Sequence, residues 1–261
     1  MLRVRVNRRS PSNRSSEHIE SHAMFTNKPE TQNLLDKPPF RWSFSQWETY
    51  NSCPAKWKFS SVMKLPRMPP GPAAARGLEI HASVEKYVIT GDAGDLHGAI
   101  KPRYIQVFDQ LRTHENGDMF CEKKLGFDAE WSVCPPAAKE VAQCIAILDA
   151  VRFRNDKTVQ VYEWKSGKPK DTHGDQRKLY ALSSFIHWKA EKAEVTTYYL
   201  EDTEVPQKLT IGQSGAEKLK LLWNDRIRQM QRDEFCAPKP SFACIWCDFS
   251  KKKGGPCRFG G

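Results

Sequence analysis

The spacing of apolar positions changes twice along the chain, and each change marks a different kind of secondary structure. From residue 44 to residue 111, apolar side chains recur every three or four positions, which predicts helices. From residue 120 to residue 165 they alternate with polar ones or form short continuous runs, which predicts strands. A helix, a strand and a final helix are predicted after residue 176. This order predicts an α/β or α+β fold with a central mixed β-sheet flanked by helices.

Four helices are expected in the first part of the chain. Ser45 and Glu48 have the spacing of a capping box, with Ser45 at the N-cap, and Pro54 suits the first turn of the next helix. Four prolines in residues 65–72 predict an extended connector. A third helix is expected over residues 73–89, and a fourth follows it. Their apolar positions are Leu78, Ile80, Val84, Tyr87 and Val88 in the third helix, and Tyr104, Ile105, Phe108 and Leu111 in the fourth.

The strand region contains a pattern that predicts a hairpin. Residues 144–154 and 158–165 are two apolar-rich runs joined by a short turn at Asp156. Before them, residues 121–134 predict one or two strands around Gly126. The remaining expected elements are a helix over 176–189, a strand over 194–200, and a helix opened by a second capping box at Ser214 and Glu217, with Leu219, Leu222, Trp223, Ile227 and Met230 on one face.

Composition narrows the class of partner. Lysine and arginine outnumber aspartate and glutamate by 41 to 31, which gives a net charge of +10 and favours a polyanionic partner such as DNA. The mean hydropathy is −0.65, and no apolar run is long enough to cross a membrane. Eight cysteines in 261 residues, without a secretory segment, indicate a reducing compartment rather than a disulfide scaffold. The expected location is the cytoplasm of a bacterium or of a phage-infected host cell.

The chain is expected to have three parts. Residues 1–40 are polar and rich in arginine and serine, which predicts a disordered basic tail. Residues 41–235 form the folded core. Residues 236–261 form a cysteine-rich basic element that packs on this core.

One group of residues in the hairpin has the chemistry of a metal site. Asp149 ends an apolar run and is costly to bury unless it meets a cation. Glu163 and Lys165 point to the same face of the next strand because side chains alternate there. Asp149, Glu163 and the backbone carbonyl of Trp164 are hard oxygen ligands suited to Mg²⁺ or Mn²⁺. Lys165 can orient or deprotonate a water that attacks phosphorus, although an exposed strand of alternating charge also explains Glu-x-Lys taken alone.

Three further residues have a functional and a structural interpretation. His81 lies on a predicted helix, either packed or exposed, and its imidazole can also supply a nitrogen ligand that favours Mn²⁺. Gln176 and Tyr180 are four residues apart and share one helix face. They are either part of a helix surface, or a hydrogen-bonding pair that supports Lys165 or contacts a DNA phosphate.

The order of these motifs resembles the RecB-type branch of the PD-(D/E)XK nuclease superfamily. The resemblance spans roughly residues 43–257 and departs from the family pattern at Ala146, where glycine is frequent. It implies a restriction-endonuclease-like core, metal binding by His81, Asp149 and Glu163, and catalysis by Lys165. The motifs that carry it are Phe44-Ser45-Gln46-Trp47-x2-Tyr50-x2-Cys53-Pro54-x2-Trp57-x-Phe59, Gly77-x3-His81, Glu122 on the first strand, Asp149, Glu163-x-Lys165-x-Gly167 and Gln176-x3-Tyr180.

The late cysteines predict a second metal site. Cys244, Cys247 and Cys257 lie close in sequence, and a tetrahedral zinc site or a cubane needs a fourth ligand. Some members of the resembled family, including CRISPR-adaptation nucleases, join one early and three late cysteines around a [4Fe-4S] cluster, which here implies Cys53 as the fourth ligand. Two alternatives remain: Zn²⁺ with Cys236 as the fourth ligand, and a basic tail without metal.

The sequence therefore predicts a Mg²⁺- or Mn²⁺-dependent deoxyribonuclease, most simply an exonuclease of DNA recombination, repair or phage DNA metabolism. A recombination or replication protein is a further expected partner. The alternatives are an overhang-trimming nuclease of the CRISPR-adaptation type, an endonuclease, and a DNA-binding scaffold whose catalytic site is degenerate.

Overall fold

The computed structural model describes residues 40–113, 117–202 and 205–260. Its centre is a seven-stranded mixed sheet in the order β3-β2-β4-β5-β6-β7, with the short β1 paired to β4. The β5–β6 and β1–β4 pairs are parallel, and the other pairs are antiparallel. The strands are β1 (Trp42–Ser43), β2 (Gly117–Phe127), β3 (Val133–Cys134), β4 (Cys144–Arg154), β5 (Thr158–Lys165), β6 (Lys192–Tyr199) and β7 (Gln207–Gly212).

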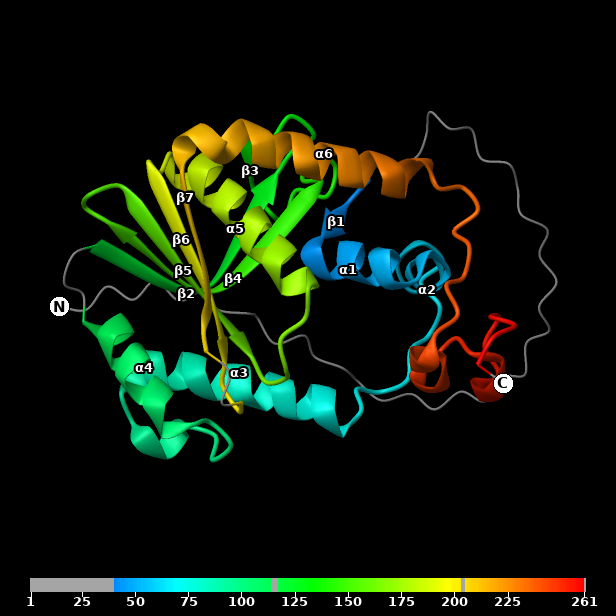
Figure 1. Ribbon diagram of the computed structural model, residues 1–261, viewed down its shortest axis with the longest axis horizontal. Coiled ribbons are helices and arrows are strands. Elements are labelled where there is room, and N and C mark those ends of the chain that lie inside the picture. Colours follow the sequence, from blue (N-terminus) through cyan, green and yellow to red (C-terminus); the bar gives the residue numbers. More distant parts are fainter. Residues whose placement is uncertain (1–39, 114–116, 203–204, 261) are drawn as a thin grey trace.

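Helices cover both faces of the sheet (Figure 1), so the predicted α/β class with a central mixed sheet is confirmed. The long α3 lies with α4 on one face, while α5 and α6 lie on the other, beside α1. The α-helices are α1 (Phe44–Ser52), α2 (Pro54–Trp57), α3 (Pro72–Thr90), α4 (Ile105–Arg112), α5 (Thr172–Trp188) and α6 (Ala216–Arg232). The shorter turns are η2 (Lys58–Val62), η3 (Ala93–Asp95), η4 (Pro102–Tyr104), η5 (Gln213–Gly215), η6 (Phe242–Trp246) and η7 (Lys251–Lys253).

The chain order explains this layering. The β4–β5 pair is an antiparallel hairpin, so a short turn joins it. The next strand, β6, is parallel to β5, and a parallel pair requires a crossover, which α5 provides. The crossover places the first turn of α5 directly after the end of β5, which is where the predicted catalytic residues lie.

Two apolar cores hold the layers together. The larger one joins the sheet to α1, α5 and α6, and Trp223 is at its centre, fully buried. Its ring stacks on Trp42 at 5.5 Å and meets Trp47 edge-on at 5.2 Å, so one side chain of α6 ties β1 and α1 to the rest. The second core joins the sheet to α3 and α4 through Phe108 and Trp164, whose rings are 5.3 Å apart.

Most predicted elements are confirmed, and two predicted helix starts are wrong. The helix α1 begins at Phe44, before Ser45, and Glu48 instead accepts a hydrogen bond from Thr172 at 2.6 Å. At the second predicted capping box, a 3-10 turn contains Ser214, so α6 begins only at Ala216.

The bounds of some elements and the exposure of Leu78 also differ from the prediction. Strand β7 is absent from the sequence prediction, and β2 and α5 each begin four residues earlier than expected. Leu78 of α3 is 66% exposed, because it projects to the side opposite the buried Ile80. The predicted tail, residues 1–40, lies outside the described residues except for Phe40. In the described part of the chain, no helix is long and apolar enough to cross a membrane.

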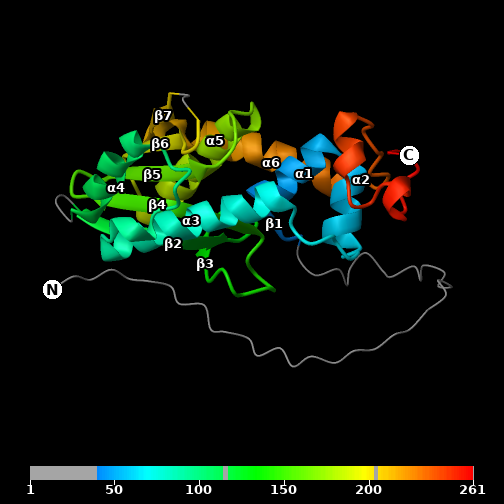
Figure 2. The same ribbon diagram turned by 90° about the horizontal axis from the view of Figure 1, so that it is seen from below.

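The C-terminal residues form short turns rather than long elements. Residues 236–260 contain η6 and η7 and lie beside α2, at the end of the molecule toward which the start of α3 points (Figures 1 and 2). Segments from the two ends of the described fold therefore lie side by side, as expected if they share a metal site.

Candidate active site

The strands β4 and β5 separate at one point, and the site lies there. Their pairing runs from Phe153–Val159 to Ala150–Tyr162 and then stops. The next residue of β4 is Asp149, and its Oδ2 accepts a hydrogen bond from the backbone N–H of Trp164 at 2.7 Å. The N–H of Trp164 therefore bonds to the Asp149 side chain instead of to a backbone carbonyl of β4, and the two strands are separated between Asp149 and the end of β5.

On its other side, Asp149 faces an unusual residue of β2. The pairs Cys121–Ala150 and Lys123–Leu148 place Glu122 opposite Asp149, yet these two residues do not pair. Glu122 has φ 47°, in the left-handed region that glutamate seldom occupies. Such strain persists where surrounding structure enforces it, often at functional sites, and here it interrupts the ladder next to the aspartate.

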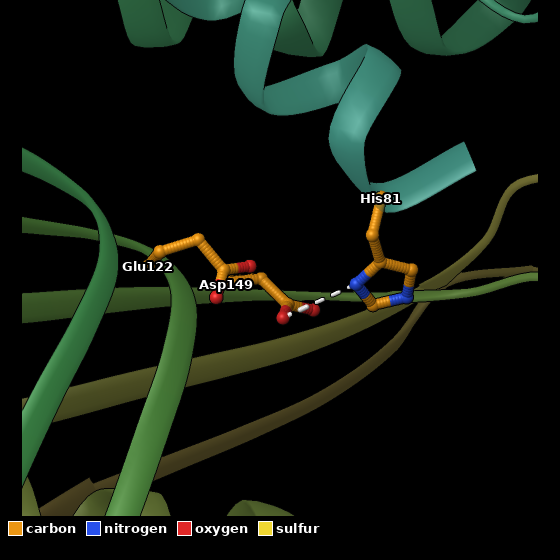
Figure 3. Close-up of side chains that lie close together, drawn as sticks. All are labelled: His81, Glu122 and Asp149. Carbon is orange, nitrogen blue, oxygen red and sulfur yellow. Dashed lines mark ion pairs between the residues drawn. The ribbon is translucent and has the colours of Figure 1, made fainter. Parts of the chain in front are cut away.

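Three side chains converge at this point (Figure 3). One potential ligand atom from each of His81, Glu122 and Asp149 lies within 4.8 Å of the others. His81 reaches the group from α3, with its Nδ1 3.3 Å from Asp149 Oδ1. Two carboxylates and an imidazole from a helix and two strands can hold a divalent cation.

The predicted Glu163 lies next to this group, in a hydrogen-bonded chain of its own. Its Oε1 accepts from Lys165 Nζ and from Gln176 Nε2, both at 2.7 Å. The same Gln176 nitrogen donates to the Tyr180 hydroxyl at 2.9 Å, and that hydroxyl donates to the carbonyl of Ile147 at 2.7 Å. The predicted spacing therefore brings Gln176 and Tyr180 together on the face of α5 that meets Glu163.

Burial and a neighbouring charge both perturb the Glu163 carboxylate, in spite of its ion pair with Lys165. Burial, and then the neighbouring negative charge of Asp149, raise the pKa of Glu163 to about 7. Its second oxygen, Oε2, is buried without a hydrogen-bond partner in the described part of the chain. A buried carboxylate oxygen without a donor fits a cation or a water held by one.

The nearby carboxylates raise the pKa of both basic side chains at the site. Burial lowers the pKa of Lys165, but the carboxylates of Glu163 and Asp149 outweigh this effect, so its pKa is raised. Burial likewise lowers the pKa of His81, and its hydrogen bond to Asp149 outweighs that.

The remaining predicted ligand is the carbonyl of Trp164. Both backbone groups of a strand residue point toward the same neighbouring strand, and the N–H of Trp164 points to Asp149 on β4. Its carbonyl therefore also faces β4. These donors are suited to a hard divalent cation, while the role of each residue remains a prediction.

The sequence patterns did not connect Glu48, Thr172 or His173 with this site. Thr172 and Glu48 join α5 to α1 through their 2.6 Å hydrogen bond. His173 stacks on Tyr199, and its Nδ1 lies 3.1 Å from the tyrosine hydroxyl. Burial, and then the charge of Lys165, lower the pKa of His173 to about 4. The sequence feature that could have pointed to His173 is its position three residues before Gln176, which puts both on one face of α5.

The close approach of α3 to the end of β5 explains why residue 77 is a glycine. A Cβ atom added to Gly77 on α3 would lie 3.0 Å from the Ser166 hydroxyl, directly after β5. The absence of a side chain lets α3 pass close to the end of β5. This closeness brings His81, one turn further along α3, to the site.

The structure also gathers the four cysteines predicted as a cluster. Cys53, Cys244, Cys247 and Cys257 are free thiols that line one pocket between α2 and the C-terminal turns. Cys236, the alternative fourth ligand, lies outside that lining and donates from its thiol to the Asp233 carbonyl at 3.0 Å. The identity of any bound group remains a prediction.

Comparison with known proteins identifies the family. The model of the PD-(D/E)XK nuclease superfamily matches residues 41–251. Among curated proteins, none matches the chain significantly.

Some solved structures are distantly similar. The crystal structure of SSO0001 has 17% sequence identity and a TM-score of 0.43, over 85% of this chain and 88% of that one. An alkaline exonuclease from Laribacter hongkongensis, LHK-Exo, has 11% identity and a TM-score of 0.37, over 74% and 89% of the two chains, and its complex with dAMP gives the same values. These similarities are too low to assign a function.

Proposed function

Since the chain belongs to the PD-(D/E)XK nuclease superfamily, whose members are metal-dependent nucleases, we propose that it hydrolyses phosphodiester bonds in DNA and acts as an exonuclease. The observation that carries this proposal is the convergence of His81, Glu122 and Asp149 beside the ion pair of the buried Glu163 and the half-buried Lys165. A degenerate scaffold has no need to keep so many charges partly buried at one point, because each is costly without a partner.

We assign the cation to His81, Asp149, Glu163 and the carbonyl of Trp164, with Glu122 as a supporting ligand. Oxygen ligands suit Mg²⁺, and a nitrogen from imidazole also suits Mn²⁺. When bound, the cation would supply charge stabilisation to the phosphate as it is attacked. The Oε2 atom of Glu163 supports this assignment, since it is buried without a hydrogen-bond donor in the described part of the chain.

The protein residues have distinct tasks in this proposal. Lys165, whose ammonium group forms a 2.7 Å ion pair with Glu163, is placed to orient the attacking water and to stabilise negative charge that develops on the phosphate. Gln176 holds Glu163 through one amide hydrogen and Tyr180 through the other. This arrangement fixes the carboxylate before the substrate arrives.

DNA as the polymer is supported by charge. The chain carries ten more basic than acidic residues, a balance suited to a phosphate backbone. We propose DNA ends as the substrate, with metabolism of recombining, repaired or phage DNA as the setting.

We also propose that Cys53, Cys244, Cys247 and Cys257 hold a [4Fe-4S] cluster with a structural role. All four line one pocket, and the N–H of Ser241 donates to Cys244 Sγ at 3.4 Å, as expected beside a thiolate. No three of their sulfur atoms lie within 4.8 Å of one another. A single tetrahedral zinc holds its thiolates close together, whereas the corners of a cubane hold them further apart.

The test is digestion of end-labelled linear, circular and single-stranded DNA with Mg²⁺, Mn²⁺ or EDTA. We expect cleavage of linear DNA with either cation, none in EDTA, and resistance of closed circles. Asp149→Asn should abolish cleavage, while Asp118→Asn, an exposed acidic position of the same sheet, should keep it. Full activity of Asp149→Asn would refute the site, and rapid linearisation of circles would show an endonuclease.

A further inference from the structure

Two aromatic rings on the C-terminal element face solvent. Phe242 is 76% exposed and Trp246 is 63% exposed, and both belong to the short turn η6. Their centroids are 4.9 Å apart at an interplanar angle of 82°, so the edge of one ring meets the face of the other and the pair braces itself in one place. Adjacent exposed aromatic side chains are uncommon on soluble proteins and mark contact sites.

The turn that carries these rings is held from its other side. Cys244 and Cys247 line the cysteine pocket, and the N–H of Cys247 donates to the Cys244 carbonyl at 3.1 Å. Lys253 donates to the Trp246 carbonyl at 3.0 Å. The backbone is therefore fixed on the pocket side, while the two rings are presented outward.

The charge around the rings indicates the kind of partner. Residues 236–261 contain five basic residues and one acidic residue, Asp248, which gives a net charge of +4. Three of the basic residues, Lys251–Lys253, are consecutive and exposed in η7. One of them, Lys253, is the residue that donates to the Trp246 carbonyl. The basic residues are Lys239, Lys251, Lys252, Lys253 and Arg258.

Exposed aromatic faces beside lysines suit an unpaired nucleic-acid strand, whose separate bases can each stack on one ring. Every base has an aromatic face that stacks on such rings, and its phosphates meet the lysines. A second copy of this chain would bring two surfaces of like charge together, which opposes association. Inside a duplex, each base is already stacked on both faces, so away from its ends a duplex can use only the lysines.

We propose that Phe242 and Trp246 form a base-stacking platform for single-stranded DNA, with Lys251, Lys252 and Lys253 on its phosphates. The platform lies beside α2, at the end of the molecule toward which the start of α3 points, and α3 carries His81 (Figures 1 and 2). This inference takes DNA as the polymer from the proposed function and does not depend on cleavage.

The test measures binding of the full chain to fluorescent oligo(dT) and to a duplex by anisotropy, with EDTA present so that no cleavage occurs. The double variant Phe242→Ala/Trp246→Ala should raise the Kd for oligo(dT) at least about tenfold and change duplex affinity much less, because stacking serves unpaired bases. Leu221→Ala, an exposed apolar residue of α6, should leave both affinities unchanged. Replacing all three lysines with alanine should instead lower the salt dependence of binding to both polymers.

The outcomes separate this platform from the nuclease proposal. An unchanged Kd for oligo(dT) in the double variant, or equal losses for both polymers, would overturn the platform even if the wild type cleaves DNA. A selective loss of oligo(dT) affinity would support it even if the wild type does not cleave. A wild-type dimer that the double variant dissociates, as measured by light scattering, would show a protein interface and overturn it.

Discussion

Replacing Tyr180 with phenylalanine removes a single oxygen atom that connects the site to the sheet. This hydroxyl accepts from Gln176 at 2.9 Å and donates to the carbonyl of Ile147 at 2.7 Å. The side chain is buried, so water cannot replace either partner. The variant therefore tests whether the hydrogen-bonded chain ending at Glu163 supports both the fold and the chemistry.

The magnitude follows from these two contacts. A buried group that loses its hydrogen-bond partner costs about 1–3 kcal/mol, and the carbonyl of Ile147 and one amide hydrogen of Gln176 both lose theirs. We expect Tyr180→Phe to lower the free energy of unfolding by about 3 kcal/mol. For a fold of this size, that corresponds to a drop in Tm of about 6–12 °C. Turnover should fall about 10–100-fold, as for residues that orient a metal ligand.

The assay is thermal unfolding followed by circular dichroism, together with cleavage of end-labelled DNA. Tyr162→Phe is the matched control, because its hydroxyl makes a longer bond of 3.3 Å to Gln160 and is only partly buried. The control should lose less than about 1 kcal/mol. If Tyr180→Phe were as stable and as active as this control, the hydrogen-bonded chain would have no such role.

Three further predictions follow from the pKa values, the cysteines and a glycine. The pKa of Glu163 is raised from 4.5 to about 7, so in EDTA its contribution to stability is present below pH 4.5 and is lost as the pH rises through 7. Calorimetry should therefore find that Tm falls less over this pH range in Glu163→Gln than in the wild type. Cys53→Ser should lose bound metal by elemental analysis, while Cys236→Ser should keep it; the opposite result would favour the zinc alternative. Gly126→Ala places a Cβ atom 2.7 Å from the Cys134 carbonyl, and denaturant titration should show a loss of about 1–3 kcal/mol; unchanged stability would show that the backbone yields there.

Local periodicity is sufficient to predict part of this site. The two-residue period of a strand puts Glu163 and Lys165 on one face, and their 2.7 Å ion pair agrees with it. The four-residue spacing on a helix likewise puts Gln176 beside Tyr180. Both contacts lie within a single element, where the backbone alone decides which side chains meet.

Contacts between distant elements are not predictable in this way. The position of Glu122 opposite Asp149 depends on strand register, which the whole core decides. Strand β7 lies at the sheet edge, and its burial alternates only between half-buried and exposed positions, so its apolar signal is weak. Ser45 fits a capping box by spacing, but a tertiary hydrogen bond from Thr172 holds Glu48 elsewhere.

The left-handed backbone of Glu122 has an evolutionary consequence. Glycine adopts such a φ value without strain, and asparagine does so more readily than glutamate. Selection for stability alone would therefore replace Glu122, whereas selection for a ligand next to Asp149 would keep it. Homologues that have lost activity should accumulate glycine or asparagine at this position and gain thermal stability as they do so. The residue at this one position would then distinguish active from inactive lineages.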